Sequence, residues 1–150
     1  PVGTCVYIVE NEMVFSYLME QVQGKNVSLL CTSGQPRYAA LKLISLIVQS
    51  GIPIYYSGGL DPDGIGIADR LWQRFGNRIQ FFGMSPEDYR NSLSKEVFGE
   101  NGRKKLEHIW HPLLRETAEL VRKTGKAGYQ ENTLKELSEK LVGCDQNQNL

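Results

Sequence analysis

The sequence predicts an α/β fold built on a mostly parallel four-stranded sheet with helices on both faces. Short, fully apolar runs rich in β-branched residues alternate three times with segments whose apolar residues recur at helical spacing. Only a few residues connect each run to the next, which is typical of right-handed βαβ crossovers. A length of 150 residues with 41% hydrophobic and 23% charged residues fits an ordinary globular domain, with or without a modest extension.

The elements follow one another in a regular order along the chain. The four predicted strands are residues 6–9, 27–31, 52–56 and 79–82. The predicted helices are residues 13–22, 39–48, 65–75, 103–123 and 132–142. Gly24, Gly51 and Gly76 follow the first three helices, and glycine is the residue that most often ends a helix. A break is expected from Gly125 to Gly128.

The alternation of strands and helices stops after Pro86, which indicates that the chain has two structural parts. We expect an α/β core at residues 1–93 and a helical extension at residues 94–150, packed on the core and ending in a frayed tail from Cys144. The chain enters its first strand almost at once and does not begin with Met, so we expect it to be the C-terminal part of a longer protein.

The composition excludes some classes of function. The 17 basic side chains equal the 17 acidic ones, which excludes nucleic-acid binding through bulk charge but leaves a local basic face open. Lys42 interrupts the best apolar stretch, so no membrane span is expected. The 3 cysteines are far apart and odd in number, which favours buried free thiols and a reducing, cytoplasmic setting.

Acidic side chains follow two of the predicted strands. In a parallel sheet, ligands bind outside the carboxyl ends of the strands, where Glu10, Asp61 and Asp63 are expected to converge. Neighbouring carboxylates repel one another, and a divalent cation such as Mg²⁺ relieves that repulsion. Other roles remain open: Asp61 before Pro62 is typical of a helix N-cap, Asp63 suits the first turn of a helix, and Glu10 could accept a hydrogen bond from a helix N-terminus.

Three segments carry a resemblance to a known family. Glu10 after the first strand, Gly34-Gln35-Pro36 before the next helix, and the run 59–64, Gly-Leu-Asp-Pro-Asp-Gly, together resemble the Toprim-like domain of the topoisomerase VI A subunit and its meiotic relatives. Over about the first 80 residues, the chain looks still closer to the C-terminal Toprim-like domains of Wadjet-type plasmid-defence nuclease subunits. The resemblance therefore implies a Toprim-like, Rossmann-like fold for this part of the chain.

The chemistry that the resemblance implies is metal-assisted cleavage of DNA phosphodiester bonds. Glu10 and Asp61 would be the catalytic pair, with Glu10, Asp61 and Asp63 as ligands of Mg²⁺ or Mn²⁺, and Glu10 could alternatively act as general acid or base. The sequence departs from the motif at Gly59, which stands where the family has its first Asp; Asp63 could take over part of that role. Tyr38 is expected to pack in a helix, so water is the expected nucleophile.

Further residues are expected at such a site. Phosphate or DNA contacts are predicted for Ser33, Gly34, Gln35, Arg37 and Lys126. Asn11 follows Glu10, and Tyr129-Gln130-Glu131 is similar to a Gln-Glu pair of the Wadjet group, which gives Asn11 and Glu131 auxiliary roles. The implied partners are DNA, a condensin-like ATPase with its accessory subunits, and an N-terminal region of the same protein.

Two other functions remain open. The first is a catalytically silent Toprim-like domain that binds DNA or partners as a scaffold, which Gly59 favours. The second is a small-molecule enzyme whose glycines contact a nucleotide, although the sequence has neither a P-loop nor the G-x-G-x-x-G spacing.

Overall fold

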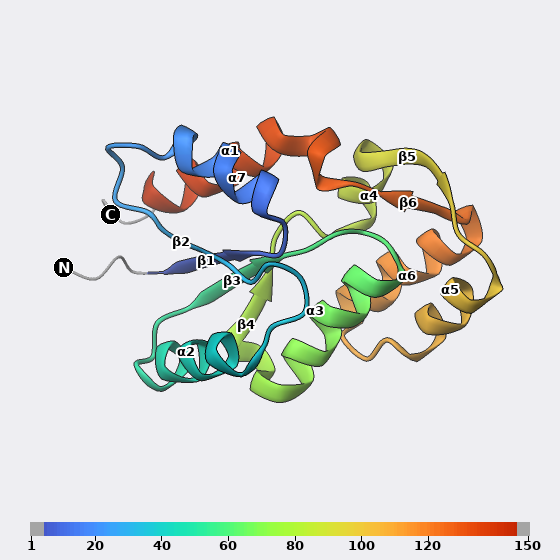
Figure 1. The fold of residues 1–150 in the computed structure, drawn as a ribbon, viewed down its shortest axis with the longest axis horizontal. Coiled ribbons are helices and arrows are strands. Elements are labelled where there is room, and N and C mark those ends of the chain that lie inside the picture. The colour runs from blue at the N-terminus through green and yellow to red at the C-terminus, as the bar shows by residue number, and fades with distance from the viewer. Residues whose placement is uncertain (1–4, 147–150) are drawn as a thin grey trace.

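Four parallel strands form the central sheet of the structure, a computed structural model that describes residues 5–146 (Figure 1). The strands are β1 (Val6–Val9), β2 (Ser28–Cys31), β3 (Ile54–Ser57) and β4 (Ile79–Phe81), in the order β2-β1-β3-β4. The predicted parallel sheet is confirmed, with Rossmann-like topology. The chain leaves β1 on one side and returns past it to β3, so the strand order reverses between β1 and β3. Ligands of open α/β sheets bind at such a reversal.

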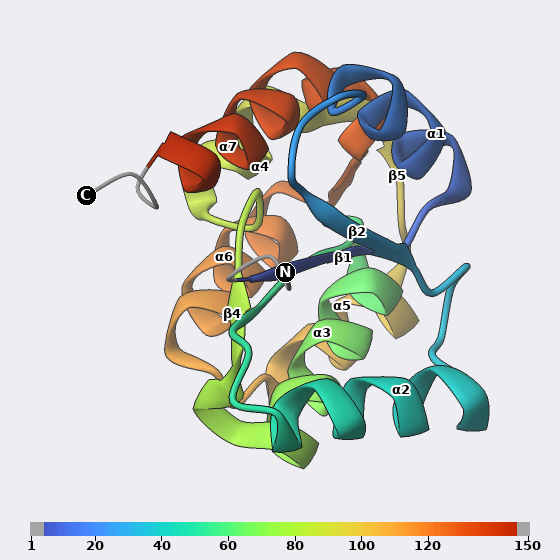
Figure 2. The same cartoon turned by 90° about the vertical axis from the view of Figure 1, so that its left-hand side faces the viewer.

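Helices cover both faces of the sheet, as predicted (Figure 2). On one face lie α1 (Glu12–Gln21) and α7 (Leu134–Gln146); on the other lie α2 (Tyr38–Gln49), α3 (Pro62–Phe75) and α6 (Pro112–Thr124). β1 shows why both faces are apolar, because successive side chains of a strand point to opposite sides. Val6 and Ile8 join the cluster under α2, α3 and α6, whereas Tyr7 and Val9 join the cluster under α1 and α7.

The C-terminal part contains more than the two predicted helices. A short helix, α4 (Pro86–Ser92), starts at a capping box formed by Ser85 and Asp88. An antiparallel pair of strands, β5 (Leu93–Val97) and β6 (Lys126–Gly128), follows. The predicted break from Gly125 to Gly128 is therefore mostly a strand.

The prediction of one helix at residues 103–123 is wrong. The segment forms α5 (Glu100–Lys105), a 3-10 turn η2 (Leu106–His108) and then α6. Pro112 starts α6, and the buried carboxylate of Asp69 accepts hydrogen bonds from the backbone N–H groups of Trp110 and His111 at 2.8–3.1 Å. These bonds hold the break, because those N–H groups are directed to α3 instead of into a helix.

The final helix returns to the sheet. A 3-10 turn, η3 (Gln130–Thr133), leads into α7, which places Leu137 and Leu141 in the cluster with α1 and agrees with the predicted helix at residues 132–142. Of the tail expected to fray, residues 144–146 belong to α7, and residues 147–150 lie outside the described residues, as do residues 1–4. Among the helices that the structure describes, none is both long and apolar enough to cross a bilayer.

Candidate functional site

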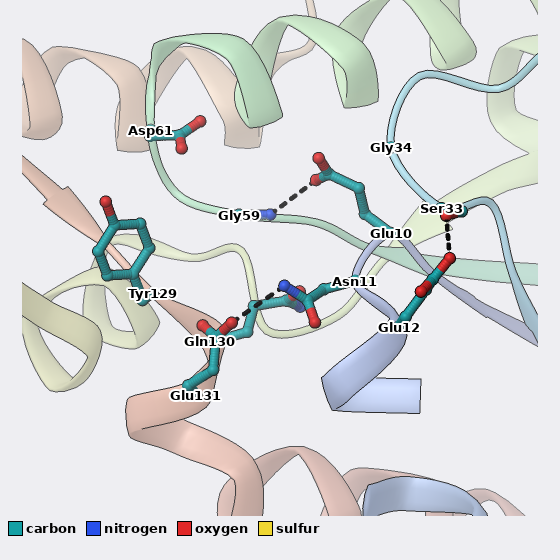
Figure 3. A pocket seen from close by; sticks show the side chains of 10 residues that line it. All are labelled: Glu10, Asn11, Glu12, Ser33, Gly34, Gly59, Asp61, Tyr129, Gln130 and Glu131. Carbon is teal, nitrogen blue, oxygen red and sulfur yellow. Dashed lines mark hydrogen bonds between the residues drawn. The ribbon is translucent and has the colours of Figure 1, made fainter. Parts of the chain in front are cut away.

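A pocket of about 450 Å³ lies at the carboxyl edge of the sheet, where the strand order reverses between β1 and β3 (Figure 3). We call it the site pocket. Polar or small residues from four separate segments line it: Glu10, Asn11, Glu12, Ser33, Gly34, Gly59, Asp61, Tyr129, Gln130 and Glu131. Glu10 and Asp61 both line the pocket, as the sequence predicted for this edge of the sheet.

Glu10 is held in the site pocket by the loop that follows β3. Its Oε2 atom accepts a hydrogen bond from the backbone N–H of Gly59 at 3.0 Å (Figure 3). A Cβ at Gly58 would lie only 2.8 Å from the same oxygen, so the absence of a side chain there allows the carboxylate to approach the loop. Glu10 is thus fixed by the backbone of the neighbouring strand's loop.

The pKa of Glu10 is raised above its ordinary value. Burial is the main cause, because it disfavours the charged form, and the carboxylates of Asp61, Asp63 and Glu131 add repulsion. The hydrogen bond from Gly59 acts in the opposite direction but does not compensate. Glu10 therefore holds its proton more readily than an exposed glutamate, in the absence of a cation.

Asp61 is a helix cap, as one of the two interpretations predicted, and it also lies in the lining of the site pocket. It is the N-cap of α3, and its Oδ1 accepts the backbone N–H of Gly64 at 2.6 Å. A Cβ at Gly64 would lie 2.2 Å from the carbonyl oxygen of Gly59. The first turn of α3 consequently lies directly against the loop that holds Glu10, and this contact fixes the two acidic residues relative to each other.

Asp63 lies outside the site pocket. Its side chain is 76% exposed and pairs with Lys105, with 2.8 Å between Oδ1 and Nζ. Among the residues whose side chains are described, no group of three His, Cys, Asp or Glu residues is arranged to hold a metal ion. The structure thus brings Glu10 and Asp61 together and directs Asp63 to α5 instead.

The C-terminal segment completes the site pocket. Leu60 and Gly128 exchange backbone hydrogen bonds of 2.9–3.0 Å, which brings the residues after β6 to the loop after β3. Gln130 is buried and donates through Nε2 to the hydroxyl of Ser57 at 2.7 Å. Its Oε1 is also buried and has no hydrogen-bond partner within the described residues. Burying an oxygen acceptor without a hydrogen-bond partner destabilises a folded protein, and a bound ligand would remove that cost.

Asn11 and Glu131 meet across the site pocket. Asn11 caps α1 through its Oδ1, which accepts the N–H groups of Met13 and Val14, and its Nδ2 donates to Glu131 Oε1 at 3.0 Å (Figure 3). The two residues predicted as auxiliary are therefore hydrogen-bonded to each other.

The predicted phosphate contacts divide into two groups. Ser33 and Gly34 line the site pocket, and the Ser33 hydroxyl donates to the carboxylate of Glu12. Gln35 lies outside the site pocket, where its Oε1 accepts from Arg70 at 2.9 Å. Arg37, at the start of α2, and Lys126, in β6, are not among the lining residues.

Two features of the region were not predicted. The expectation that Tyr38 packs is wrong, because the start of α2 presents it to solvent and it is 79% exposed; it does not line the site pocket, so water remains the proposed nucleophile. Glu12 and Gln130 line the site pocket but were not singled out as site residues. Glu12 directly follows Glu10 and Asn11 at the end of β1, which is the signal that could have identified it.

The charged side chains that line the site pocket are acidic. Within the described part of the chain, four carboxylates line it, those of Glu10, Glu12, Asp61 and Glu131, and no lysine, arginine or histidine does. Four neighbouring carboxylates attract cations and repel a phosphate that arrives without one.

The chain is similar to a known protein family. The family model described as "Protein of unknown function C-terminus (DUF2399)" matches residues 1–141, which is nearly the whole chain and includes every residue that lines the site pocket. A search of curated proteins found no match.

Proposed function

This chain belongs to the DUF2399 family, whose description states no activity, and we propose that its site pocket binds Mg²⁺ or Mn²⁺ and hydrolyses DNA phosphodiester bonds. One observation carries the proposal: of the residues that the structure describes, four carboxylates and no basic side chain line a pocket at the strand reversal of a parallel sheet. Pockets at this position bind ligands in open α/β sheets. A cluster of acids with no basic partner is most simply explained by a bound cation.

The residues present fit a hard divalent cation. Mg²⁺ prefers oxygen ligands and usually takes one or two carboxylates, with waters and substrate oxygens completing its shell. Glu10 and Asp61 supply two carboxylates, and Gln130, whose Oε1 is buried without a partner among the described residues, lines the same pocket. The absence of a group of three ligands among the described side chains fits Mg²⁺ better than zinc, which requires protein ligands for most of its shell.

The chain's own residues would act as follows. Glu10 and Asp61 hold the cation, each fixed beforehand by a backbone N–H group, that of Gly59 for Glu10 and that of Gly64 for Asp61. The cation, when bound, polarises a phosphate oxygen and stabilises the charge of the transition state. Water would be the nucleophile. In the alternative arrangement, in which Glu10 does not hold the cation, its carboxyl group would act as general acid or base.

We also propose that the chain is a Toprim-like nuclease module that works within a condensin-like plasmid- or phage-defence system. The resemblance of residues 59–64 to the Toprim motif supports this setting. So does the position of Glu10 and Asp61 at the ends of the adjacent strands β1 and β3. In such a system the partners would be DNA and a condensin-like ATPase with its accessory subunits.

A catalytically silent scaffold domain is the second candidate. It is favoured by Gly59, which offers no carboxylate, and by Asp63, which pairs with Lys105 and does not face the site pocket. A nucleotide-binding enzyme is a weaker alternative, because no basic residue of the site pocket would bind its phosphates.

Cleavage of supercoiled plasmid by the whole protein, in Mg²⁺ or Mn²⁺, tests the proposal. Nicking should disappear in Glu10→Gln and in Asp61→Asn, both of which keep the hydrogen-bonding oxygen, and Asn remains a good N-cap. Glu107→Gln, a change of the same kind on the exposed side of η2, is the matched control and should cleave normally. Equal cleavage by all variants would show that Glu10 and Asp61 do not carry the reaction. No cleavage by the folded wild-type protein with its partners would support the scaffold instead.

A further inference from the structure

A chain of three hollows continues the site pocket along α3. The first, of about 190 Å³, shares Asp61 and Tyr129 with the site pocket. The second, of about 390 Å³ between α3, α5 and η2, shares Asp63 and Lys105 with the first. The third, also of about 390 Å³, shares Arg70 with the second. We call these three hollows the α3 groove; α3 itself lies between α2 and α5 (Figure 1).

The charge of the lining changes sign along this path. Among the described residues, four carboxylates and no basic side chain line the site pocket, and the first hollow is still mainly acidic, with Asp61, Asp63 and Glu96 beside Lys105. In the second hollow, Asp63 and Asp69 lie with Arg70, Lys105 and His108, and Asp69 is buried and satisfied by the backbone of residues 110 and 111. The third hollow has Arg70 and Arg74, and none of the described residues that line it is acidic. The groove therefore leads from a region that attracts cations to one that attracts anions.

The basic side chains of the groove are available to a ligand. Arg70 is exposed, and its hydrogen-bond partner in the structure is the neutral side chain of Gln35. Lys105 pairs with Asp63, but the two side chains are 58% and 76% exposed, and such surface pairs add little stability. Either cation can therefore exchange its partner for a phosphate at small cost.

The length of the groove matches a short run of nucleotides. From Asp61 to Arg70 the helix advances nine residues, about 14 Å at about 1.5 Å per residue. That is roughly four nucleotides at about 3.4 Å per step of one strand. A substrate phosphate in the site pocket would meet only acidic residues and a cation, so the phosphates next to it need basic partners, and the groove supplies them.

We propose that the α3 groove binds the phosphodiester backbone of one DNA strand on one side of the scissile phosphate, with Lys105 and Arg70 contacting successive phosphates. The inference rests on the proposed function, because it takes the site pocket as the place of cleavage. The groove would bind the phosphates next to the scissile one, for which the described residues of the site pocket include no basic partner. It also gives Asp63 a role opposite to that of a metal ligand, since its carboxylate competes with DNA for Lys105.

Binding of labelled oligothymidylate to the whole protein tests the groove separately from cleavage. Anisotropy is measured with EDTA and with Ca²⁺ over a range of salt concentrations. Arg70→Gln and Lys105→Gln should each reduce the salt slope by about 0.7, equivalent to about fivefold weaker binding at about 0.1 M salt. Asp63→Asn should tighten binding, because it removes a negative charge and releases Lys105. Lys135→Gln, an exposed lysine on α7 at the opposite face of the sheet, is the matched control.

The outcomes separate the two proposals. All three groove positions are exposed, so the variants should unfold at the wild-type temperature. If Arg70→Gln and Lys105→Gln bind no more weakly than Lys135→Gln, or if Asp63→Asn binds more weakly than wild type, the groove is not the strand path, even where the protein cleaves plasmid. If binding follows the predicted order but no metal supports cleavage, the groove stands and the nuclease activity fails. The same series with oligouridylate and with duplex DNA identifies which nucleic acid the groove accepts.

Discussion

Asn11 and Glu131, 120 residues apart in the sequence, are joined by a hydrogen bond of 3.0 Å from Nδ2 to Oε1. Asn11 follows β1 and caps α1, whereas Glu131 lies in the turn before α7. One amide thus satisfies two helix N–H groups with its oxygen and binds a pocket carboxylate with its nitrogen. The bond holds the C-terminal segment across the edge of the sheet, so the site pocket depends on both ends of the described chain.

Replacing Asn11 by Ala should therefore affect both stability and the site. Loss of the cap and of the bond to Glu131 is expected to lower the free energy of unfolding by about 1 to 2 kcal/mol. Urea denaturation measures this loss, and isothermal titration with Mn²⁺ reports on the site. Ser85→Ala, which removes the cap of α4 away from the site pocket, should cost a similar amount but leave Mn²⁺ binding unchanged. Equal effects on Mn²⁺ binding would mean that the contact with Glu131 has no role in the site.

Much of the core could be predicted because its signals are local. β1 is four consecutive apolar residues, and Asp61 before Pro62 marks the start of α3; the structure confirms both. The break between α5 and α6 was missed because its cause is the carboxylate of Asp69, about 40 residues upstream. Periodicity within a window cannot detect an acceptor that only folding brings close.

The site was predicted in part for the same reason. Glu10 and Asp61 follow adjacent strands, so the sheet alone brings them together. Asp63 is two residues from Asp61, but helical geometry turns it to the side of α3 that faces Lys105, 42 residues away. Gln130 comes to the site pocket only because the backbone of Gly128 pairs with that of Leu60.

Replacement by Ala should have different effects at Gly58 and Gly59, the two neighbouring glycines of the loop after β3. In Gly58→Ala the new methyl group would lie 2.8 Å from Glu10 Oε2, so the carboxylate must move. In Gly59→Ala the nearest atom, in the Asp61 carboxylate, is 3.8 Å away, an ordinary contact. We expect Gly58→Ala to reduce metal-dependent plasmid cleavage at least about tenfold, since small misplacements of a reacting group have large effects. Gly59→Ala should cleave like wild type, and a comparable loss in both variants would show that Glu10 is not positioned in this way.

Glu10→Gln is expected to stabilise the protein at neutral pH when no divalent cation is present. A carboxyl group whose pKa is raised on folding binds more protons in the folded state, so it destabilises the fold as the pH rises from the unfolded pKa through the folded one. Glutamine removes this cost and keeps the oxygen that accepts from Gly59. Thermal denaturation at pH 7 in EDTA should give a higher Tm for the variant. Added Mn²⁺ should raise the Tm of wild type but not that of Glu10→Gln; a lower Tm for the variant in EDTA would contradict this reasoning.

Asp88 should give the opposite dependence on pH. Burial opposes its ionisation, but the hydrogen bond from Lys140 at 2.8 Å and those from Ser85 outweigh burial, and the pKa of Asp88 lies below its ordinary value. A lowered pKa contributes stability that is complete above the unfolded value and is lost as the pH falls through the folded value, that is, below about pH 4. Lys140→Met removes the partner from α7 and should flatten this part of the stability profile. Urea midpoints between pH 2 and pH 6, with Lys135→Met as the control on the same helix, measure the effect; parallel profiles for wild type and Lys140→Met would show that the pair does not tie α7 to α4.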